Sequence, residues 1–232
     1  MKKKILYLFT FFILVSFSCT PKKTQTTFSN NTVKDIDGNV YKTVKIGKQW
    51  WMAENLKVTH YRNGDKIPCL NEDDEWDRPT GAYCYYNNDT ANIRKYGILY
   101  NWFAVDEHRN IAPAGWHVPS DDEWQVLVDY LGGDTVAGGK MKSTGTIEGS
   151  DGLWRGSNEG TINKSGFSAL PGGYRYNHGV YDGLGTNSYF WSSTESNGGN
   201  AWHRYLYFGN SNVYCDDSGW KQAGYSIRCV KD

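Results

Sequence analysis

The sequence predicts an α+β domain built on an irregular antiparallel sheet, with one or two helices and long loops. Its 232 residues include 26 Gly, 10 Trp and 17 Tyr. This composition suits short strands that pack around large side chains and are joined by tight turns. One segment, residues 115–133, carries a full set of helix signals, whereas the remainder alternates aromatic runs with glycine turns.

The N-terminal segment is predicted to direct export. Lysines at positions 2–4 precede an apolar stretch over residues 5–15 and a cysteine at position 19. The apolar stretch is shorter than the ~20 residues that a membrane-spanning helix needs. Residues 1–18 are therefore expected to be a signal peptide, similar to bacterial lipoprotein signals that place a lipid on the new N-terminal Cys19. The alternative is an ordinary secretory signal.

This interpretation divides the chain into three parts. Residues 1–18 form the signal peptide, residues 19–32 a polar tether, and residues 33–232 the globular domain. The expected location is the cell envelope, with membrane attachment through the lipid anchor alone. The formal net charge is zero, so charge gives no basis for a nucleic-acid partner.

The remaining cysteines are Cys69, Cys84, Cys215 and Cys229. An even number in an exported chain predicts two disulfides, for which three connectivities exist. Proximity along the chain favours Cys69–Cys84 and Cys215–Cys229. Free thiols are the alternative. A metal site is disfavoured because no CxxC or HxxxH spacing is present.

Local patterns predict the elements in order. Residues 33–52 alternate apolar and polar side chains around an Asp37-Gly38 turn and a second turn at Gly47, which indicates strands joined by hairpins. Residues 58–90 are predicted to form an irregular loop region. Residues 96–105 fit either a strand or a short helix.

The helix signals follow. Ser120 and Glu123 form a capping box, and Gly132 and Gly133 end the helix. Its apolar face consists of Trp124, Leu127, Val128 and Leu131. The last third of the chain is predicted to form antiparallel strands at "GYRYNHGVYDGLG", "SYFWSST", "AWHRYLYF", "SNVYC" and "YSIRCV".

Several of these segments together resemble one family. "DIDGNVYKTVKIGKQWWMAENLK", "PAGWHVPSDDEWQVLVDYLGG", "SGFSALPGGYR", "FWSSTE" and "GYSIRCVKD" occur in the order of the Fibrobacter succinogenes major paralogous (FISUMP) domain, found in exported proteins and lipoproteins of Bacteroidetes and Fibrobacter. The resemblance covers residues 33–232. It implies a C-type-lectin-like fold, distantly similar to formylglycine-generating enzymes. Many relatives have Cys-Pro where this chain has Ala112-Pro113, which implies Cys215 as the replacement partner of Cys229.

No catalytic residue is predicted, and the chain is not expected to be an enzyme. The copper chemistry of the distant enzyme relatives needs an accessible cysteine pair, whereas Cys215 and Cys229 fit a disulfide better. The five histidines show no ligand spacing, and no G-x-S-x-G motif occurs. The sugar motifs of calcium-dependent lectins are also absent. No cofactor is predicted, although a structural calcium ion in the acidic loops stays open.

Binding by aromatic side chains is the functional hypothesis that remains. If "AWHRYLYF" is a strand, Trp202, Arg204, Leu206 and Phe208 lie on one face and the alternate residues on the other. The alternative for each aromatic residue is packing in the core. The candidate ligand-binding residues are Tyr176, Tyr181, His203, Tyr205, Tyr207, Asn210 and Asn212.

The predicted function is an exported, lipid-anchored binding module that recognises a glycan or an envelope protein. Two alternatives stay open from the sequence. One is a metal-dependent enzyme of the formylglycine-generating type, and the other is a structural adhesin component.

Overall fold

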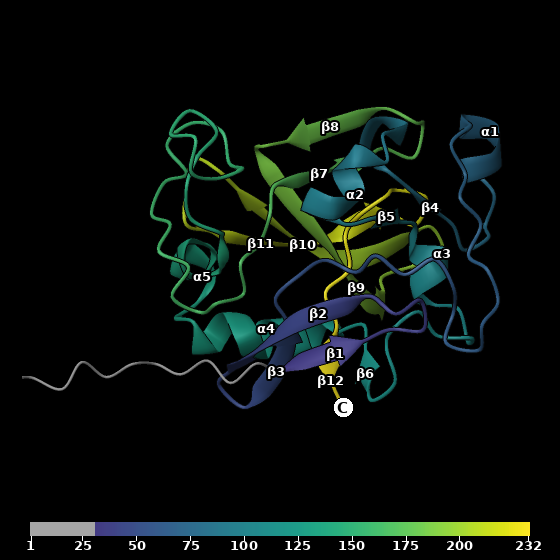
Figure 1. Cartoon of the computed structure of the whole chain (residues 1–232), viewed down its shortest axis with the longest axis horizontal. Helices are drawn as coiled ribbons and strands as arrows, with labels where there is room; N and C mark the ends of the chain where they lie inside the picture. The colour runs from purple at the N-terminus through teal and green to yellow at the C-terminus, as the bar shows by residue number, and fades with distance from the viewer. Residues whose placement is uncertain (1–30) are drawn as a thin grey trace, which may run out of the picture.

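The computed structural model describes residues 31–232 and contains two five-stranded sheets (Figure 1). The signal peptide, Cys19 and nearly all of the tether lie outside the described residues. The first sheet has the order β1 (Thr32–Lys34), β2 (Val40–Ile46), β3 (Gln49–Met52), β12 (Val230–Lys231) and β6 (Trp116–His117). The second has the order β11 (Val213–Trp220), β10 (Asn200–Tyr207), β9 (Asn187–Glu195), β7 (Gly172–Arg175) and β8 (Tyr181–Leu184).

The helices and a third sheet are formed by residues between β3 and β7 in the sequence. A two-stranded sheet pairs β4 (Tyr83–Cys84) with β5 (Leu99–Tyr100). The helices are α1 (Asp73–Trp76), a 3₁₀ turn (Tyr86–Asn88), α2 (Ala91–Tyr96), α3 (Trp102–Val105), α4 (Asp121–Tyr130) and α5 (Asp134–Met141). Neighbouring strands are antiparallel except for β7 and β9. The predicted antiparallel α+β class is confirmed, and residues 96–105 supply both a strand and a short helix.

Local sequence explains the first sheet. The Asp37-Gly38 turn joins β1 to β2, and Gly38 has a φ of +85°, which glycine adopts without strain. The second turn joins β2 to β3 at Gly47, where an added Cβ would lie 2.9 Å from the Tyr130 ring. Both predicted hairpins are therefore present, and the second one packs directly against α4.

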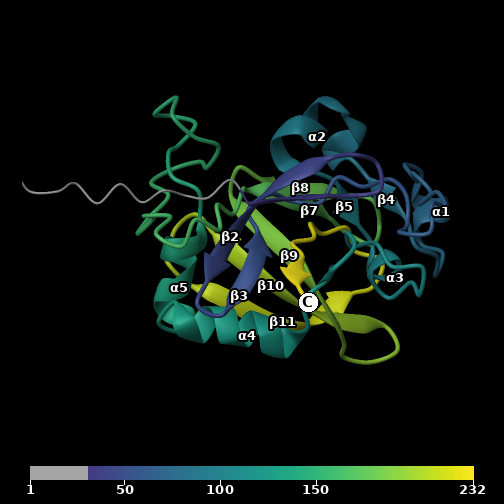
Figure 2. The same cartoon turned by 60° about the horizontal axis from the view of Figure 1, so that its bottom comes forward.

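Helix α4 forms as the sequence predicts. Ser120 Oγ accepts from the Glu123 amide while the Glu123 carboxylate accepts from the Ser120 amide, so both ends of the capping box are satisfied. The apolar face is buried against β9 and β10 through Phe190 and Leu206. Figure 2 shows α4 and α5 lying along one side of the second sheet.

Helix α5 shows how close the helix layer comes to the sheet. It contains Gly138 and Gly139, which are poor helix formers. A Cβ on Gly138 would lie 2.3 Å from the Asn212 carbonyl oxygen, in the turn that joins β10 to β11. The two glycines therefore permit backbone contact between α5 and this turn.

The predicted disulfides are not present, because all four cysteines are free thiols. Cys69 forms a parallel bridge with Tyr83, and opposed residues of a bridge point to the same face while the next residue points to the other. The Cys84 side chain consequently lies on the opposite face from Cys69. Cys84 is buried and Cys69 is exposed.

The second pairing is also wrong, because its cysteines belong to different layers. Cys215 lies on β11, opposite Arg204, with its Sγ 4.0 Å from the Asp121 carboxylate of α4. Cys229 is fully buried beside β3, where its carbonyl oxygen accepts from the Met52 amide. Burial raises the pKa of Cys84 to about 12 and also raises that of Cys229, so both thiols stay protonated.

Arg228 holds three distant segments together in the core. It is fully buried and donates to the carbonyl oxygens of Met52 (3.1 Å), Phe167 (2.5 Å) and Ser168 (3.0 Å). Its Nε donates to Asn55 Oδ1 at 2.6 Å. Burial lowers the pKa of Arg228 to about 9. The guanidinium therefore satisfies carbonyl groups that no strand ladder pairs.

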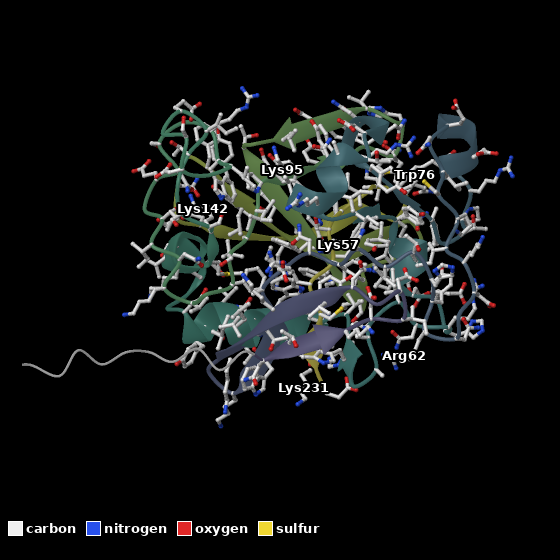
Figure 3. The ribbon with its side chains drawn as sticks, in the orientation of Figure 1. Lys57, Arg62, Trp76, Lys95, Lys142 and Lys231 are labelled. Atoms are coloured by element: carbon white, nitrogen blue, oxygen red, sulfur yellow. The ribbon has the colours of Figure 1, made fainter. Side chains whose placement is uncertain are left out.

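Lys142, labelled in Figure 3, has a similar role at the end of α5. The side chain is fully buried, and Nζ lies within hydrogen-bond distance of the carbonyl oxygens of Glu159 (3.0 Å), Tyr207 (3.2 Å), Phe208 (3.3 Å) and Asn210 (2.9 Å). Burial lowers the pKa of Lys142 to about 8. The ammonium thus ties residues 159 and 207–210 to the end of α5.

Replacing Arg228 should test its structural role. Arg228→Leu leaves buried carbonyl oxygens without donors, so we expect it to lower the free energy of unfolding by about 3–5 kcal/mol. Arg94→Leu, on the exposed surface of α2, is the control and should change it by less than ~0.5 kcal/mol. Urea unfolding of the wild type and both variants measures the difference. Equal stability of the two variants would show that the carbonyl cluster does not depend on Arg228.

Candidate binding surface

A row of tyrosines crosses the second sheet on the face that points away from α4 and α5. Tyr214 on β11 and Tyr189 on β9 are both direct cross-strand partners of Tyr205 on β10. Tyr174 on β7 continues the row, since the neighbouring Gly173 pairs with Ser188. Tyr214, Tyr205, Tyr189 and Tyr174 are called the tyrosine row below. All four are half-buried.

Three rings of the tyrosine row stack on one another, and the fourth, that of Tyr174, is tilted against its neighbour. The ring centroids of Tyr205 and Tyr214 are 4.5 Å apart with an interplanar angle of 8°, and those of Tyr205 and Tyr189 are 5.0 Å apart at 13°. Tyr189 and Tyr174 are 4.5 Å apart at 51°. Both faces of Tyr205 are therefore covered by neighbouring rings. What this residue offers to solvent is its ring edge and its hydroxyl group.

Burial changes steeply along this face of the sheet. Trp191 is fully buried, and its Nε1 donates to the Tyr100 carbonyl oxygen of β5 at 2.8 Å. His203 is 4% exposed, and the Tyr225 ring lies over both, with centroid distances of 4.2 Å to Trp191 and 5.0 Å to His203. Tyr207, four residues further along β10, is 37% exposed. The tyrosine row thus lies between the part of this face that Tyr225 covers and the part that is exposed to solvent.

His203 supports the tyrosine row from its buried side. Its ring stacks on Tyr189 at 5.7 Å and on Tyr205 at 6.1 Å. Burial is the main cause that lowers the pKa of His203 to about 4. The imidazole is therefore neutral at physiological pH, and its place in the molecule is that of a buried packing residue.

Polar side chains border the tyrosine row at both ends. At the β11 end, the side-chain amides of Asn210 and Asn212 donate to the Tyr214 hydroxyl at 2.9 and 3.4 Å. At the β7 end, the Tyr174 hydroxyl donates to the Tyr176 hydroxyl at 2.8 Å, and Tyr176 stacks on His178 at 5.1 Å. The row is thereby held by hydrogen bonds at each end.

The hydroxyls of Tyr174, Tyr189 and Tyr205 remain protonated. Burial raises the pKa of Tyr174, Tyr189 and Tyr205 above the ordinary tyrosine value, and nearby tyrosines and Asp216 add to the effect. The hydroxyls can therefore both donate and accept hydrogen bonds over the physiological range. Asp216 lies beside the row, on the rung of His203, and Asp182 lies opposite Tyr174 on β8. Both borders consequently carry a carboxylate.

Most of the residues predicted from sequence gather at this surface. His203 and Tyr205 belong to the stacked cluster, and Tyr176, Asn210 and Asn212 lie at its ends. Tyr207 lies on the same strand face but packs against Phe208 at 4.5 Å. Tyr181 lies apart, since its ring contacts Tyr86 and its hydroxyl donates to Asn88 Oδ1 at 2.7 Å.

Sequence reasoning missed Tyr174, Tyr189 and Tyr214. Each is a tyrosine in a predicted strand, but the register that places it opposite a neighbour is not visible in one sequence. The strand alternation in "AWHRYLYF" is confirmed for Arg204 and Leu206, which are buried on the helix-covered face. A bulge between Ala201 and His203 interrupts the alternation at Trp202.

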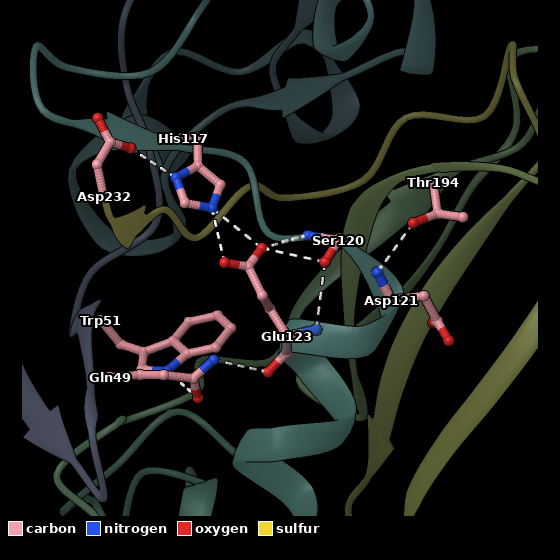
Figure 4. A network of polar contacts seen from close by, with 8 residues as sticks. All are labelled: Gln49, Trp51, His117, Ser120, Asp121, Glu123, Thr194 and Asp232. Atoms are coloured by element: carbon pink, nitrogen blue, oxygen red, sulfur yellow. Dashed lines mark hydrogen bonds and ion pairs between the residues drawn. The ribbon is translucent and has the colours of Figure 1, made fainter.

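A second polar cluster contains serine, histidine and acidic residues (Figure 4). His117 Nδ1 lies 2.6 Å from an Asp232 carboxylate oxygen, and His117 Nε2 lies 2.8 Å from Glu123 Oε1. Ser120 Oγ donates to the same Glu123 carboxylate. Both histidine nitrogens face carboxylates, so no nitrogen is placed to accept the serine proton. The cluster is a structural tie between the C-terminal strand and the start of α4.

Among the side chains that the structure describes, no group of three or more His, Cys, Asp or Glu is arranged to hold a metal ion. Three cavities of about 260, 530 and 280 Å³ are lined by residues outside the tyrosine row. No helix among the described residues has the length and apolar character of a membrane span. The tyrosine row is a half-buried surface on the face of the second sheet that points away from α4 and α5.

Comparison with known proteins gives one finding. A family model described as "Fibrobacter succinogenes major domain" matches residues 44–231. No curated protein and no solved structure matches the chain.

The tie at His117 predicts a pH dependence of stability. Although partial burial opposes it, hydrogen bonds to Asp232 and Glu123 raise the pKa of His117 above its usual 6.5. A raised folded-state pKa means that the stabilisation is complete below pH 6.5 and is lost as pH rises through the folded-state value. Because the group is partly exposed, we expect a loss of ~1 kcal/mol or less.

The variant His117→Asn should lose this part of the pH profile. Unfolding free energies measured from pH 5.5 to pH 8.5 are expected to fall less in His117→Asn than in the wild type. His108→Asn, whose side chain is 89% exposed, is the matched control and should retain the wild-type profile. Identical profiles for all three proteins would contradict the assignment.

Proposed function

Because the chain belongs to the Fibrobacter succinogenes major domain family, we propose that it is an exported, lipid-anchored binding module without catalytic activity. We place its domain among the C-type-lectin-like folds and its ligand among glycans. The observation that carries the proposal is the tyrosine row, three stacked rings and a fourth tilted ring in register on four adjacent strands.

The geometry of the row suits a polymer with repeated hydroxyl groups. Neighbouring ring centroids are 4.5–5.0 Å apart, close to the strand separation of the sheet. A glycan chain laid across the strands would meet ring edges and phenolic hydroxyls at this repeat. Each hydroxyl can exchange a hydrogen bond with a sugar hydroxyl. The stacked rings are already ordered, which reduces the entropy lost on binding.

The border of the row favours a neutral glycan over an acidic one. Asp216 and Asp182 stand at its edges, and like charges brought together across an interface weaken binding. Asn210 and Asn212 add amide groups that pair with sugar hydroxyls. A neutral polysaccharide therefore fits this surface better than a uronic-acid or sulfated polymer.

An envelope protein is the second candidate ligand. The observation that favours it is Trp220, at the end of the edge strand β11, whose side chain is 59% exposed. Large exposed aromatic residues are frequent anchors in protein interfaces. In that case Trp220→Ala should weaken binding more than any change in the tyrosine row.

A glycan-binding screen with the full-length protein tests the proposal. Tyr205→Phe removes one hydroxyl and keeps the stacked ring, so we expect about a fivefold weaker affinity for a bound neutral glycan, the equivalent of one hydrogen bond of ~1 kcal/mol. The control is Tyr130→Phe. Tyr130 is 65% exposed and lies on α4, which covers the opposite face of the second sheet from the tyrosine row. The screen is run with calcium and with chelator to reveal a calcium requirement.

Two results would count against the glycan. One is the absence of binding across plant, host and bacterial glycans. The other is binding that Tyr205→Phe and Tyr130→Phe weaken equally. Unfolding measurements on each variant exclude loss of structure as the cause.

A further inference from the structure

A small cavity lies where the β2–β3 hairpin meets α4. Its volume is about 280 Å³, and it is lined by residues of β2, α4, α5 and the segment 164–165, none of which belongs to the tyrosine row. Three lysines contribute to its lining: Lys45, Lys140 and Lys164. The other lining residues are Ile46, Tyr130, Leu131 and Ser165. None of the lining residues is acidic.

The lysines come from three segments that local contacts hold in place. Lys140 of α5 donates from Nζ to the Leu131 carbonyl oxygen at 2.6 Å, at the end of α4. The Ser165 amide and hydroxyl both donate to the Lys140 carbonyl oxygen, at 3.1 and 2.7 Å. These two bonds hold the adjacent Lys164 next to Lys140. Lys45 approaches from β2, where it pairs with Trp50.

The positive charge of the cavity is not neutralised by the domain. Among the side chains that the structure describes, no carboxylate forms an ion pair with Lys45, Lys140 or Lys164. Three lysines line one cavity, so their like charges repel each other, and a bound anion would reduce this repulsion. Lysine is a strongly hydrated point charge and a common partner of phosphate.

The cavity also lies beside the point at which the chain enters the domain. The Asn31 carbonyl oxygen accepts from both the amide and the hydroxyl of Thr43, at 3.0 and 2.9 Å. Thr43 and Lys45 are two residues apart on β2 and point to the same face. Asn31, the first residue that the structure describes, therefore lies close to the strand that supplies Lys45.

We propose that the cavity formed by Lys45, Lys140 and Lys164 binds the phosphate of an anionic lipid headgroup. The proposal rests on the lipid anchoring proposed above, which would hold this end of the domain at a membrane. Each basic residue near an anionic bilayer strengthens the attraction of the protein to the bilayer several-fold. Headgroup binding would orient the domain with the tyrosine row directed away from the cavity side.

Binding of water-soluble lipids to the full-length protein tests the proposal. The probes are dihexanoyl phosphatidylglycerol below its micelle concentration, dihexanoyl phosphatidylcholine as the neutral headgroup, and inorganic phosphate. Lys45→Glu combined with Lys164→Glu is expected to weaken phosphatidylglycerol binding roughly tenfold or more. Lys66→Glu combined with Lys95→Glu makes the same change of charge at exposed positions elsewhere and should leave binding unchanged.

Each outcome is informative. Tighter binding of phosphatidylglycerol than of phosphatidylcholine, lost in the cavity variant alone, supports the proposal. Equal losses in both double variants overturn it, since the effect would then be one of net charge. If phosphate binds as tightly as phosphatidylglycerol, the lipid is overturned as the source of the anion. The glycan screen depends on Tyr205, which does not line this cavity, so failure there leaves this result unaffected.

Discussion

Unpaired backbone carbonyl groups are the constraint on which this fold depends. A chain with short strands and long loops buries many carbonyl oxygens that no ladder satisfies, and each unsatisfied group destabilises the folded state. Arg228 satisfies three such groups by donating hydrogen bonds to the carbonyl oxygens of Met52, Phe167 and Ser168. These residues belong to sequence segments more than a hundred positions apart. One guanidinium therefore ties β3 of the first sheet to the loop that precedes β7, and leucine, which has no hydrogen-bond donor, could not.

A second buried cation connects the core to the tyrosine row. Lys142 donates from its buried Nζ to the carbonyl oxygens of Tyr207, Phe208 and Asn210. The Asn210 side chain in turn donates to the Tyr214 hydroxyl. The turn between β10 and β11 is thereby held from the buried side, and it positions the last ring of the row. A buried cation without a carboxylate partner thus contributes to the geometry of the exposed surface.

Sequence could predict the elements whose signals are local. The capping box of Ser120 and Glu123 and the turn at Gly38 depend on residues within a few positions of each other, and both are present. Helix α5 was not foreseen because Gly138 and Gly139 argue against a helix, and the close contact that requires them is long-range. The cysteine pairing failed for a similar reason. Nearness in sequence says nothing about which face of a strand a side chain occupies.

The tyrosine row was foreseen in part for the same physical reason. Alternation within one strand predicts that His203 and Tyr205 share a face, and they do. Whether the residues opposite them are also tyrosines depends on strand register, which is set by the turns and by packing of the whole sheet. The burial of His203 likewise depends on Tyr225 and β5, which approach from distant parts of the chain.

An open row of stacked rings has consequences for affinity. Because neighbouring tyrosines cover the faces of Tyr205, a ligand there gains hydrogen bonds and edge contacts, and little apolar area is enclosed. Such contacts are individually weak, since each replaces a bond to water. A polymer that spans the row, or many modules held on one surface, adds these contacts without repeating the full entropy loss of association. The geometry therefore favours a long, repetitive ligand over a small molecule, and anchoring at a membrane would strengthen that preference.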